Sequence, residues 1–200
     1  MKKLTLLICA LFALAANAQN FRGGAFAGVS VSQIDGDRCS GYYQPGLIIG
    51  ASVDRALSEK FSLAMELKFL QKGAREIVQE TDRYYKVRLN YIQVPVLAQY
   101  RIWSNFIGEA GLGFAFLINA KEDFDGYGYE RTEDYRRFEL AGIFGVAYDI
   151  PKLPLRLGAR FSYSVLPVRR IENVDPIGFY DQTAQYNNNL EFALTYFFTK

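Results

Sequence analysis

Apolar and polar residues alternate with period two over much of this chain. In the clearest example, residues 61–72, every odd position from Phe61 to Phe69 is apolar. The residues between them are small or charged, as at Glu66 and Lys68, with Leu70 as the exception. Because side chains of a strand point alternately to its two faces, this pattern predicts a β-strand with one apolar and one polar face.

Seven other segments carry the same alternation, three of them in a weaker form. The eight predicted strands cover residues 25–33, 46–57, 61–72, 87–101, 106–120, 137–150, 155–165 and 189–198. Within 87–101 the alternation slips near Tyr91 and Ile92, which indicates a β-bulge at that point. Beyond residue 18, no uncharged segment reaches the roughly 18 to 20 apolar residues that a membrane helix requires. The pattern therefore predicts an all-β chain.

The connections between these strands alternate in length. Three are short (58–60, 103–105 and 151–154), and four are long and polar (34–44, 73–86, 121–135 and 166–187). Outer-membrane barrels with an even number of strands have short periplasmic turns and longer extracellular loops. We therefore expect an eight-stranded antiparallel up-and-down transmembrane β-barrel, with both termini on the periplasmic side.

The main alternative is a periplasmic soluble barrel of the lipocalin type, which also has eight antiparallel strands. A soluble barrel would bury its apolar face, yet here the apolar face is large and aromatic and the opposite face is small and charged. The charged residues of that second face are Glu66, Lys68, Glu109, Arg137, Glu139, Arg156, Arg160 and Glu191. Eight strands leave an interior just wide enough for side chains to fill. We expect these eight residues to form a structural network of ion pairs in a filled lumen.

The first eighteen residues have the features of a cleaved signal peptide. Lys2 and Lys3 precede an uncharged apolar segment, and Ala16-Asn17-Ala18 supplies small residues before the expected cleavage site. Residues 19–200 then form a single barrel domain, for which we expect the outer membrane as the location. Cleavage also removes Cys9, so Cys39 is the one remaining cysteine and no intramolecular disulfide is possible.

Composition argues against several classes of function. Without Lys2 and Lys3 the chain has 21 basic and 21 acidic residues, a balance that disfavours nucleic acid as a partner. There is no histidine, which removes Ser-His-Asp triads, Cys-His dyads and histidine metal sites. No G-x-S-x-G, P-loop or G-x-G-x-x-G motif occurs. We expect no enzyme activity, no cofactor and no resident metal.

Two acidic features leave alternatives open. Glu109 and Glu139 share the polar face and could serve as a general acid and base, although an ion-pair network is the simpler interpretation. The loop 121–135 holds six acidic residues and could bind calcium loosely, but Lys121 and Thr132 occupy the first and last ligand positions of an EF-hand alignment and exclude that motif.

Fragments spread over the chain resemble the PorT-like outer-membrane β-barrel family. They are GAFAGVSVS at 24–32, Pro45-Gly46, LSEKFSL at 57–63, ELKFLQKG at 66–73, LNYIQVP at 89–95, GLGFAF at 111–116 and Tyr196-Phe197-Phe198. The resemblance implies an eight-stranded outer-membrane barrel, and some members of the family are linked to assembly of a protein secretion apparatus. The chain departs from the usual barrel-insertion signal, because Thr199 and Lys200 follow the last aromatic residue.

These observations predict a non-enzymatic integral outer-membrane protein that acts through its extracellular loops. Its partners would be outer-membrane lipid and, through the loops, another envelope or secretion protein or a surface polysaccharide. The loop tyrosines would either form a recognition surface or belong to the aromatic girdle at the membrane boundary. A small porin-like channel is the alternative function.

Overall fold

The computed structural model describes residues 21–37, 39, 41–78, 83–123, 126–170 and 184–198. The predicted signal peptide lies outside these residues, and so do parts of the long connections. Within the described residues, no helix has the length and apolar character needed to cross a membrane.

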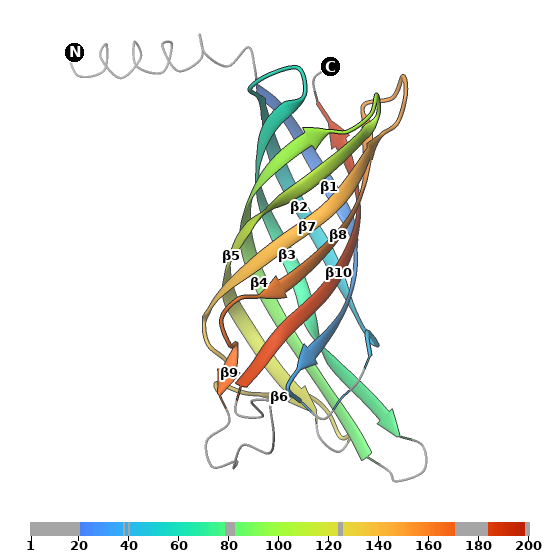
Figure 1. Cartoon of the computed structure of the whole chain (residues 1–200). Coiled ribbons are helices and arrows are strands. Elements are labelled where there is room, and N and C mark those ends of the chain that lie inside the picture. The colour runs from blue at the N-terminus through green and yellow to red at the C-terminus, as the bar shows by residue number, and fades with distance from the viewer. Residues whose placement is uncertain are drawn as a thin grey trace, which may run out of the picture.

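Eight long strands close into a single barrel (Figure 1). They are β1 (Phe21–Asp35), β2 (Gln44–Ala56), β3 (Phe61–Val78), β4 (Arg83–Arg101), β5 (Phe106–Asp123), β7 (Phe138–Asp149), β8 (Leu155–Ser164) and β10 (Ala184–Phe197). Each strand pairs antiparallel with its neighbours in the chain, and β1 pairs with β10 to complete the ring. Two short strands, β6 (Glu130–Arg131) and β9 (Arg169–Arg170), add to β5 and β10. The predicted eight-stranded up-and-down barrel is confirmed.

The short turns and the long connections lie at opposite ends of the barrel (Figure 1). The β2–β3 turn is closed by backbone bonds from Leu57 and Ser58 to the carbonyl of Phe61, at 2.9 and 3.0 Å. The Ser58 hydroxyl accepts a further bond from the Phe61 amide at 3.1 Å. This turn is therefore closed by its own backbone and by the hydroxyl of Ser58.

Over most of its length the barrel has an apolar outer surface and a polar inner one. Leu67 and Phe144 point outward, with 58% and 62% of their surface exposed. The intervening residues of the same strands point inward and are buried, as Glu66 and Lys68 are. The lipocalin-like alternative is wrong, because a soluble barrel would expose its polar face instead.

The irregularity expected near Tyr91 is present, but its extra residue lies on the neighbouring strand. The β4–β5 register shifts between Asn90 and Tyr91, where Leu117 and Asn119 are consecutive partners and Ile118 has none. β4 itself keeps its alternation, with Val87 and Tyr91 both buried inside. The apparent slip in the sequence arises because large apolar residues occupy inward positions at this end of β4.

The β3–β4 hairpin is longer than the alternation predicts. Its ladder continues from Gly73 opposite Arg88 to Val78 opposite Arg83. At Gly73 the backbone has a positive φ of 152°, and a Cβ there would lie 2.0 Å from the carbonyl oxygen of Val87. Glycine is therefore needed for this close approach of the two strands.

Candidate functional site

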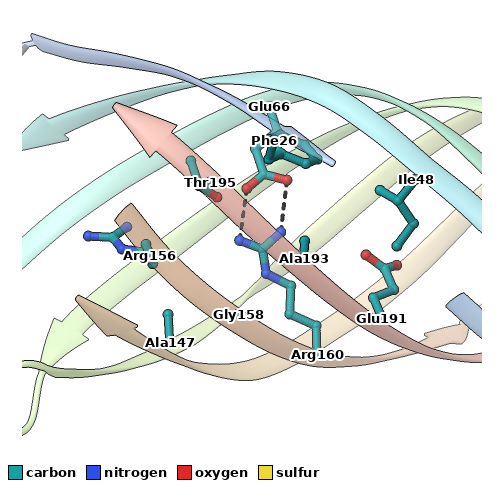
Figure 2. Close-up of a pocket in the computed structure, with 10 residues that line it drawn as sticks. All are labelled: Phe26, Ile48, Glu66, Ala147, Arg156, Gly158, Arg160, Glu191, Ala193 and Thr195. Atoms are coloured by element: carbon teal, nitrogen blue, oxygen red, sulfur yellow. Dashed lines mark hydrogen bonds and ion pairs between the residues drawn. The ribbon is translucent and has the colours of Figure 1, made fainter. Parts of the chain in front are cut away.

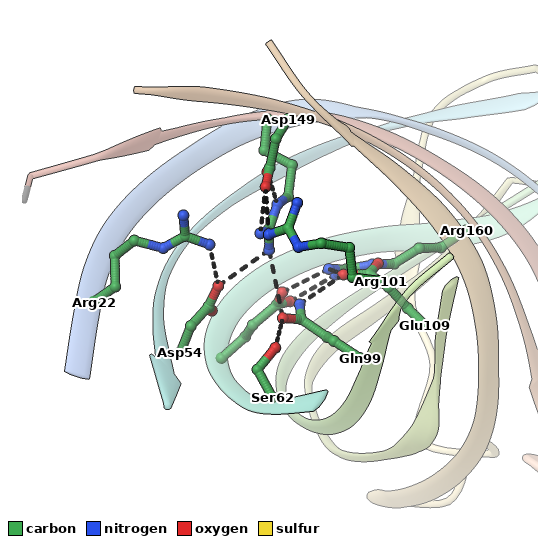
Figure 3. Close-up of polar contacts among 10 residues, drawn as sticks. Arg22, Asp54, Ser62, Gln99, Arg101, Glu109, Asp149 and Arg160 are labelled. Carbon is green, nitrogen blue, oxygen red and sulfur yellow. Dashed lines mark hydrogen bonds and ion pairs between the residues drawn. The ribbon is translucent and has the colours of Figure 1, made fainter. Parts of the chain in front are cut away.

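A cluster of arginines and aspartates fills the barrel interior at its short-turn end (Figure 3). Arg156 is at the centre, with ion pairs of 3.0 Å to Asp54 and 2.6 Å to Asp149. Arg22 pairs with Asp54 at 3.0 Å, and Arg101 pairs with Asp149 at 3.2 Å. Each aspartate thus bridges two guanidinium groups, so neither carboxylate is left uncompensated.

Deeper in the barrel, Arg160 of β8 links to Glu66 of β3 (Figure 2) and to Glu109 of β5 (Figure 3). Its guanidinium donates two bonds of 2.8 Å to Glu66, one to each carboxylate oxygen. Its Nε donates a third bond, of 2.7 Å, to Glu109. The Glu109 carboxylate also accepts a hydrogen bond of 2.8 Å from the side-chain amide of Gln99. Bidentate pairing of this kind is strong and directional, and it fixes the positions of both carboxylates.

Two lysine–glutamate pairs follow toward the long-loop end. Lys68 pairs with Glu191, and Lys72 Nζ lies 2.7 Å from Glu139. All four side chains are at most 4% exposed. The amide of Asn187 donates a 2.7 Å bond to the second oxygen of Glu139. Buried charges are tolerated here because each is paired and hydrogen-bonded.

Beyond these pairs, toward the long-loop end, the lumen holds buried apolar side chains, which we call the apolar plug. The plug consists of Ile34, Ala74, Val87, Leu89, Tyr91, Ala115, Leu117, Ala120, Tyr135 and Val168. Its members come from four strands and from the segments that lead to the long connections. The plug separates the charged interior from the long-loop side of the barrel.

A second polar cluster lies on the far side of the plug. Arg169 pairs with Glu122 at 2.7 Å and with Asp134 at 2.7 Å. The Tyr135 hydroxyl donates a 3.0 Å bond to Glu122. Burial, together with nearby Tyr85 and Glu122, raises the pKa of the Tyr135 hydroxyl far above its ordinary value. The hydroxyl therefore stays protonated and serves as a donor to Glu122.

The structure places most of the sequence-predicted charges in the lumen. Glu66, Lys68, Glu109, Glu139, Arg156 and Glu191 are buried, and the Arg160 side chain is 13% exposed. Arg137 differs, since it is exposed and has no ion-pair partner among the described residues. Its position follows the inward phase of β7, but that strand begins only at Phe138, so the side chain is not constrained to point inside.

Charged residues of the interior network that were not in the predicted set include Asp54, Lys72, Glu122 and Asp149. Lys72 has the same phase as Glu66 and Lys68, so counting along the strand would have included it. Glu122 follows the bulge at Ile118, where the phase reverses. Nothing in the sequence fixes that reversal, so strand phase alone could not have placed Glu122 inside.

Glu109 and Glu139 have different cationic partners. Glu109 pairs with Arg160, whereas Glu139 pairs with Lys72. For metals, no group of three or more acidic or thiol side chains in the described part of the chain is arranged to hold an ion. Two residues of the acidic loop, 124 and 125, lie outside that part.

The first long connection holds the single described cysteine. Burial raises the pKa of Asp37 to about 7, and the backbone amide of Cys39 donates a 2.9 Å bond to its carboxylate. Burial and the neighbouring carboxyls of Asp37 and Glu76 raise the pKa of the Cys39 thiol. This thiol is therefore a poor nucleophile at neutral pH.

Comparison with known proteins supports the barrel assignment. A family model described as "Outer membrane protein beta-barrel domain" matches residues 17–168. No curated protein matches the chain.

Several solved structures are similar to this chain. Ail of Yersinia pestis is 15% identical, with a TM-score of 0.52 over 90% of this chain and 100% of its own. Neisserial surface protein A is 12% identical, with a TM-score of 0.56 over 89% of this chain and 97% of its own. The outer membrane protease OmpT of Escherichia coli, 10% identical, covers 89% of this chain and 95% of its own at a TM-score of 0.41. The likeness to Ail and to Neisserial surface protein A establishes the fold, and at these identities it says nothing about activity.

Proposed function

Because the chain belongs to the outer membrane protein β-barrel domain family, we propose that it is a non-enzymatic barrel that acts through its long connections as a contact surface. The protein is an integral protein of the outer membrane, and outer-membrane lipid surrounds its apolar band. In this family of architectures the long connections face the outside of the cell and the short turns face the periplasm. Residues 1–18 would then serve as the signal peptide that directs the chain to export.

The filled interior is the observation that carries this proposal. Arg156 and Arg160 cross the lumen to β2, β3 and β5, and the apolar plug lies beyond them. The cavity beside Arg160 has a volume of about 10 Å³, which is room for a single water. Eight-stranded barrels are narrow enough for side chains to fill completely. This arrangement argues against the porin-like alternative.

The interior carboxylates support a structural role over a catalytic one. A general acid or base must reach a substrate proton, whereas Glu66 and Glu109 are held by the same guanidinium. Glu139 is similarly fixed by Lys72 and Asn187. We therefore assign Glu66, Lys68, Glu109, Glu139, Arg156, Arg160 and Glu191 to a stabilising network, together with Lys72.

The finer assignment is to the PorT-like barrels, whose fragments occur in order along this chain. The corresponding partner would be another envelope protein, a component of a secretion apparatus or a surface polysaccharide. An exposed aromatic side chain supports such a contact, because Tyr127, in the third long connection, is 97% exposed. Exposed tyrosines provide contact area at a low entropic cost.

A photo-crosslinking experiment in intact cells tests the contact surface. A benzoylphenylalanine at Tyr127 should give a discrete adduct with a surface component, because this residue lies at the long-loop end. The same substitution at Trp103, which is 72% exposed at a short turn, is the matched control and should not give that adduct. Discrete, reproducible conductance of the pure protein in a planar bilayer would instead favour a channel and refute the proposal.

A further inference from the structure

The outer wall of the barrel has a recess where the pairing of β5 with the following segment is interrupted. β7 pairs with β5 as far as Phe138 opposite Phe116, and β6 pairs with β5 again at Arg131 opposite Lys121. Thr132 still donates to the carbonyl of Ala120 and Arg137 still accepts from the amide of Leu117, so only the segment 133–136 leaves the sheet; its Arg136 amide bonds to the carbonyl of Val168, before β9. A cavity of about 240 Å³ occupies the gap.

Two arginines border this recess, Arg131 at the end of β6 and Arg137 just before β7. Arg131 and Arg137 both line the cavity, both are exposed, and neither has an ion-pair partner among the described residues. Lys121, also exposed, stands directly opposite Arg131 across the β5–β6 ladder. Like charges that face each other across a ladder are destabilising. One acid, Glu133, also lines the cavity, so an excess of positive charge remains.

The edge of the same recess that lies farther from the long-loop end is apolar and belongs to the outward-facing surface of the barrel. Phe116 and Ile118 line the cavity and are 41% and 50% exposed. Phe138 packs edge to face against Phe116, at 5.2 Å between ring centroids, and is 75% exposed. The arginines therefore stand at the loop-side limit of the apolar band. In an outer-membrane barrel this level corresponds to the headgroups of the outer leaflet.

We propose that this recess binds a phosphorylated glycolipid of the outer leaflet. Its phosphate would lie between Arg131 and Arg137, and one acyl chain would run along Phe116 and Phe138. Guanidinium groups match phosphate oxygens in geometry and form strong charge-assisted hydrogen bonds with them. The aromatic edge selects an amphiphile over a soluble anion, because a free phosphate would leave that apolar surface without a contact.

The test uses the mature barrel in detergent micelles, titrated with fluorescent lipid A that carries its phosphates. Arg131→Gln/Arg137→Gln should weaken binding roughly tenfold or more, since two charge-assisted contacts are lost. The control Arg55→Gln/Lys60→Gln removes the same charge at the short-turn end, where both residues are exposed, and should change binding less than about twofold. Retention of the folded form is verified by its altered mobility on unheated gels.

Three further measurements separate the sources of binding. Glu133→Gln should tighten binding several-fold by removing the one carboxylate at the cavity, and this variant stands on its own if the double variant does not fold. Equal binding of lipid A stripped of its phosphates would overturn the proposal, because the arginines would then play no part. Displacement of the lipid by millimolar inorganic phosphate alone would also overturn it, since the apolar edge would then contribute nothing. Unchanged affinity of the double variant would likewise refute it.

Discussion

The Lys72–Glu139 pair offers the sharpest test of how the filled lumen stabilises the barrel. Both side chains are almost completely buried, and their charged atoms are 2.7 Å apart. Lys72→Met keeps most of the volume of the side chain and removes its charge. Glu139 would then keep only the neutral donors Ser164 and Asn187, at 2.9 and 2.7 Å. Breaking a buried pair by removal of one partner costs about 3–5 kcal/mol, and we expect a loss of stability in that range.

The double variant Lys72→Met/Glu139→Gln distinguishes the charge effect from the loss of packing. It leaves no buried charge at this site, while a glutamine can still accept bonds from the two neutral donors. We expect it to cost less than about 2 kcal/mol, well below the single variant, because no uncompensated ion remains. Lys60→Met, at an exposed lysine of the first short turn, is the control and should stay within about 0.5 kcal/mol of the parent.

Reversible urea unfolding from phospholipid vesicles measures these differences. The chain has a single tryptophan, Trp103, whose side chain is 72% exposed at a short turn, so its fluorescence reports insertion of that end. A Lys72→Met variant that loses less than about 1 kcal/mol would contradict the reasoning. So would a double variant that is as unstable as the single one, since packing rather than charge would then explain both losses.

Two pairs of substitutions and one labelling reaction test the facing of the strands, the close approach of β5 to β4 and the reactivity of the Cys39 thiol. Leu67→Arg, on the exposed apolar row, should cost roughly 2–4 kcal/mol of stability in the same vesicles. Ala64→Ser, on the inner face, should be well tolerated. If Ala64→Ser is the more destabilising of the two, the assignment of the two faces is inverted. Gly111→Ala should cost about 1–3 kcal/mol, because its Cβ would lie 2.0 Å from a backbone oxygen of β4. Gly142→Ala should be neutral, because the nearest atom to its Cβ, on the Phe144 ring, would lie at an ordinary contact distance of 3.9 Å. An impermeant maleimide should label Cys39 in intact cells, but slowly at neutral pH and faster as the pH is raised, because the pKa of its thiol is raised. Rapid labelling at neutral pH would contradict the buried acidic surroundings seen here.

The periodicity of the sequence was sufficient to predict the ring of strands, because an apolar outer surface and a polar inner one require strict alternation. The same logic failed near Tyr91, where the inner surface becomes apolar. Val87 and Leu89 point inside like the charged residues of other strands, yet they belong to the apolar plug. An alternation argument assumes that one face keeps one polarity along the whole strand, and the plug violates that assumption.

Pairing inside the lumen was equally hard to predict. The sequence shows that Arg160 and Glu66 share the polar face, but not that their strands face each other across the barrel. That geometry depends on the stagger of all eight strands around the ring, which no local pattern encodes. Arg137 illustrates the limit at a strand end, because it directly precedes β7 and its exposed side chain does not follow the inward phase of that strand.

The crosswise ion pairs also have a consequence for the order of folding events. Lys68 and Glu191 are 123 residues apart in the chain, and Arg156 and Asp54 are 102 apart, so no local hairpin can bring either pair together. An open sheet inserted in lipid would expose these charges, and long-range closure is intrinsically slow. We expect the ring to close while water still fills its lumen, with the pairs locking afterwards. Lys72→Met should then accelerate unfolding and leave the folding rate almost unchanged; a slower folding rate would mean that the pairs form before closure.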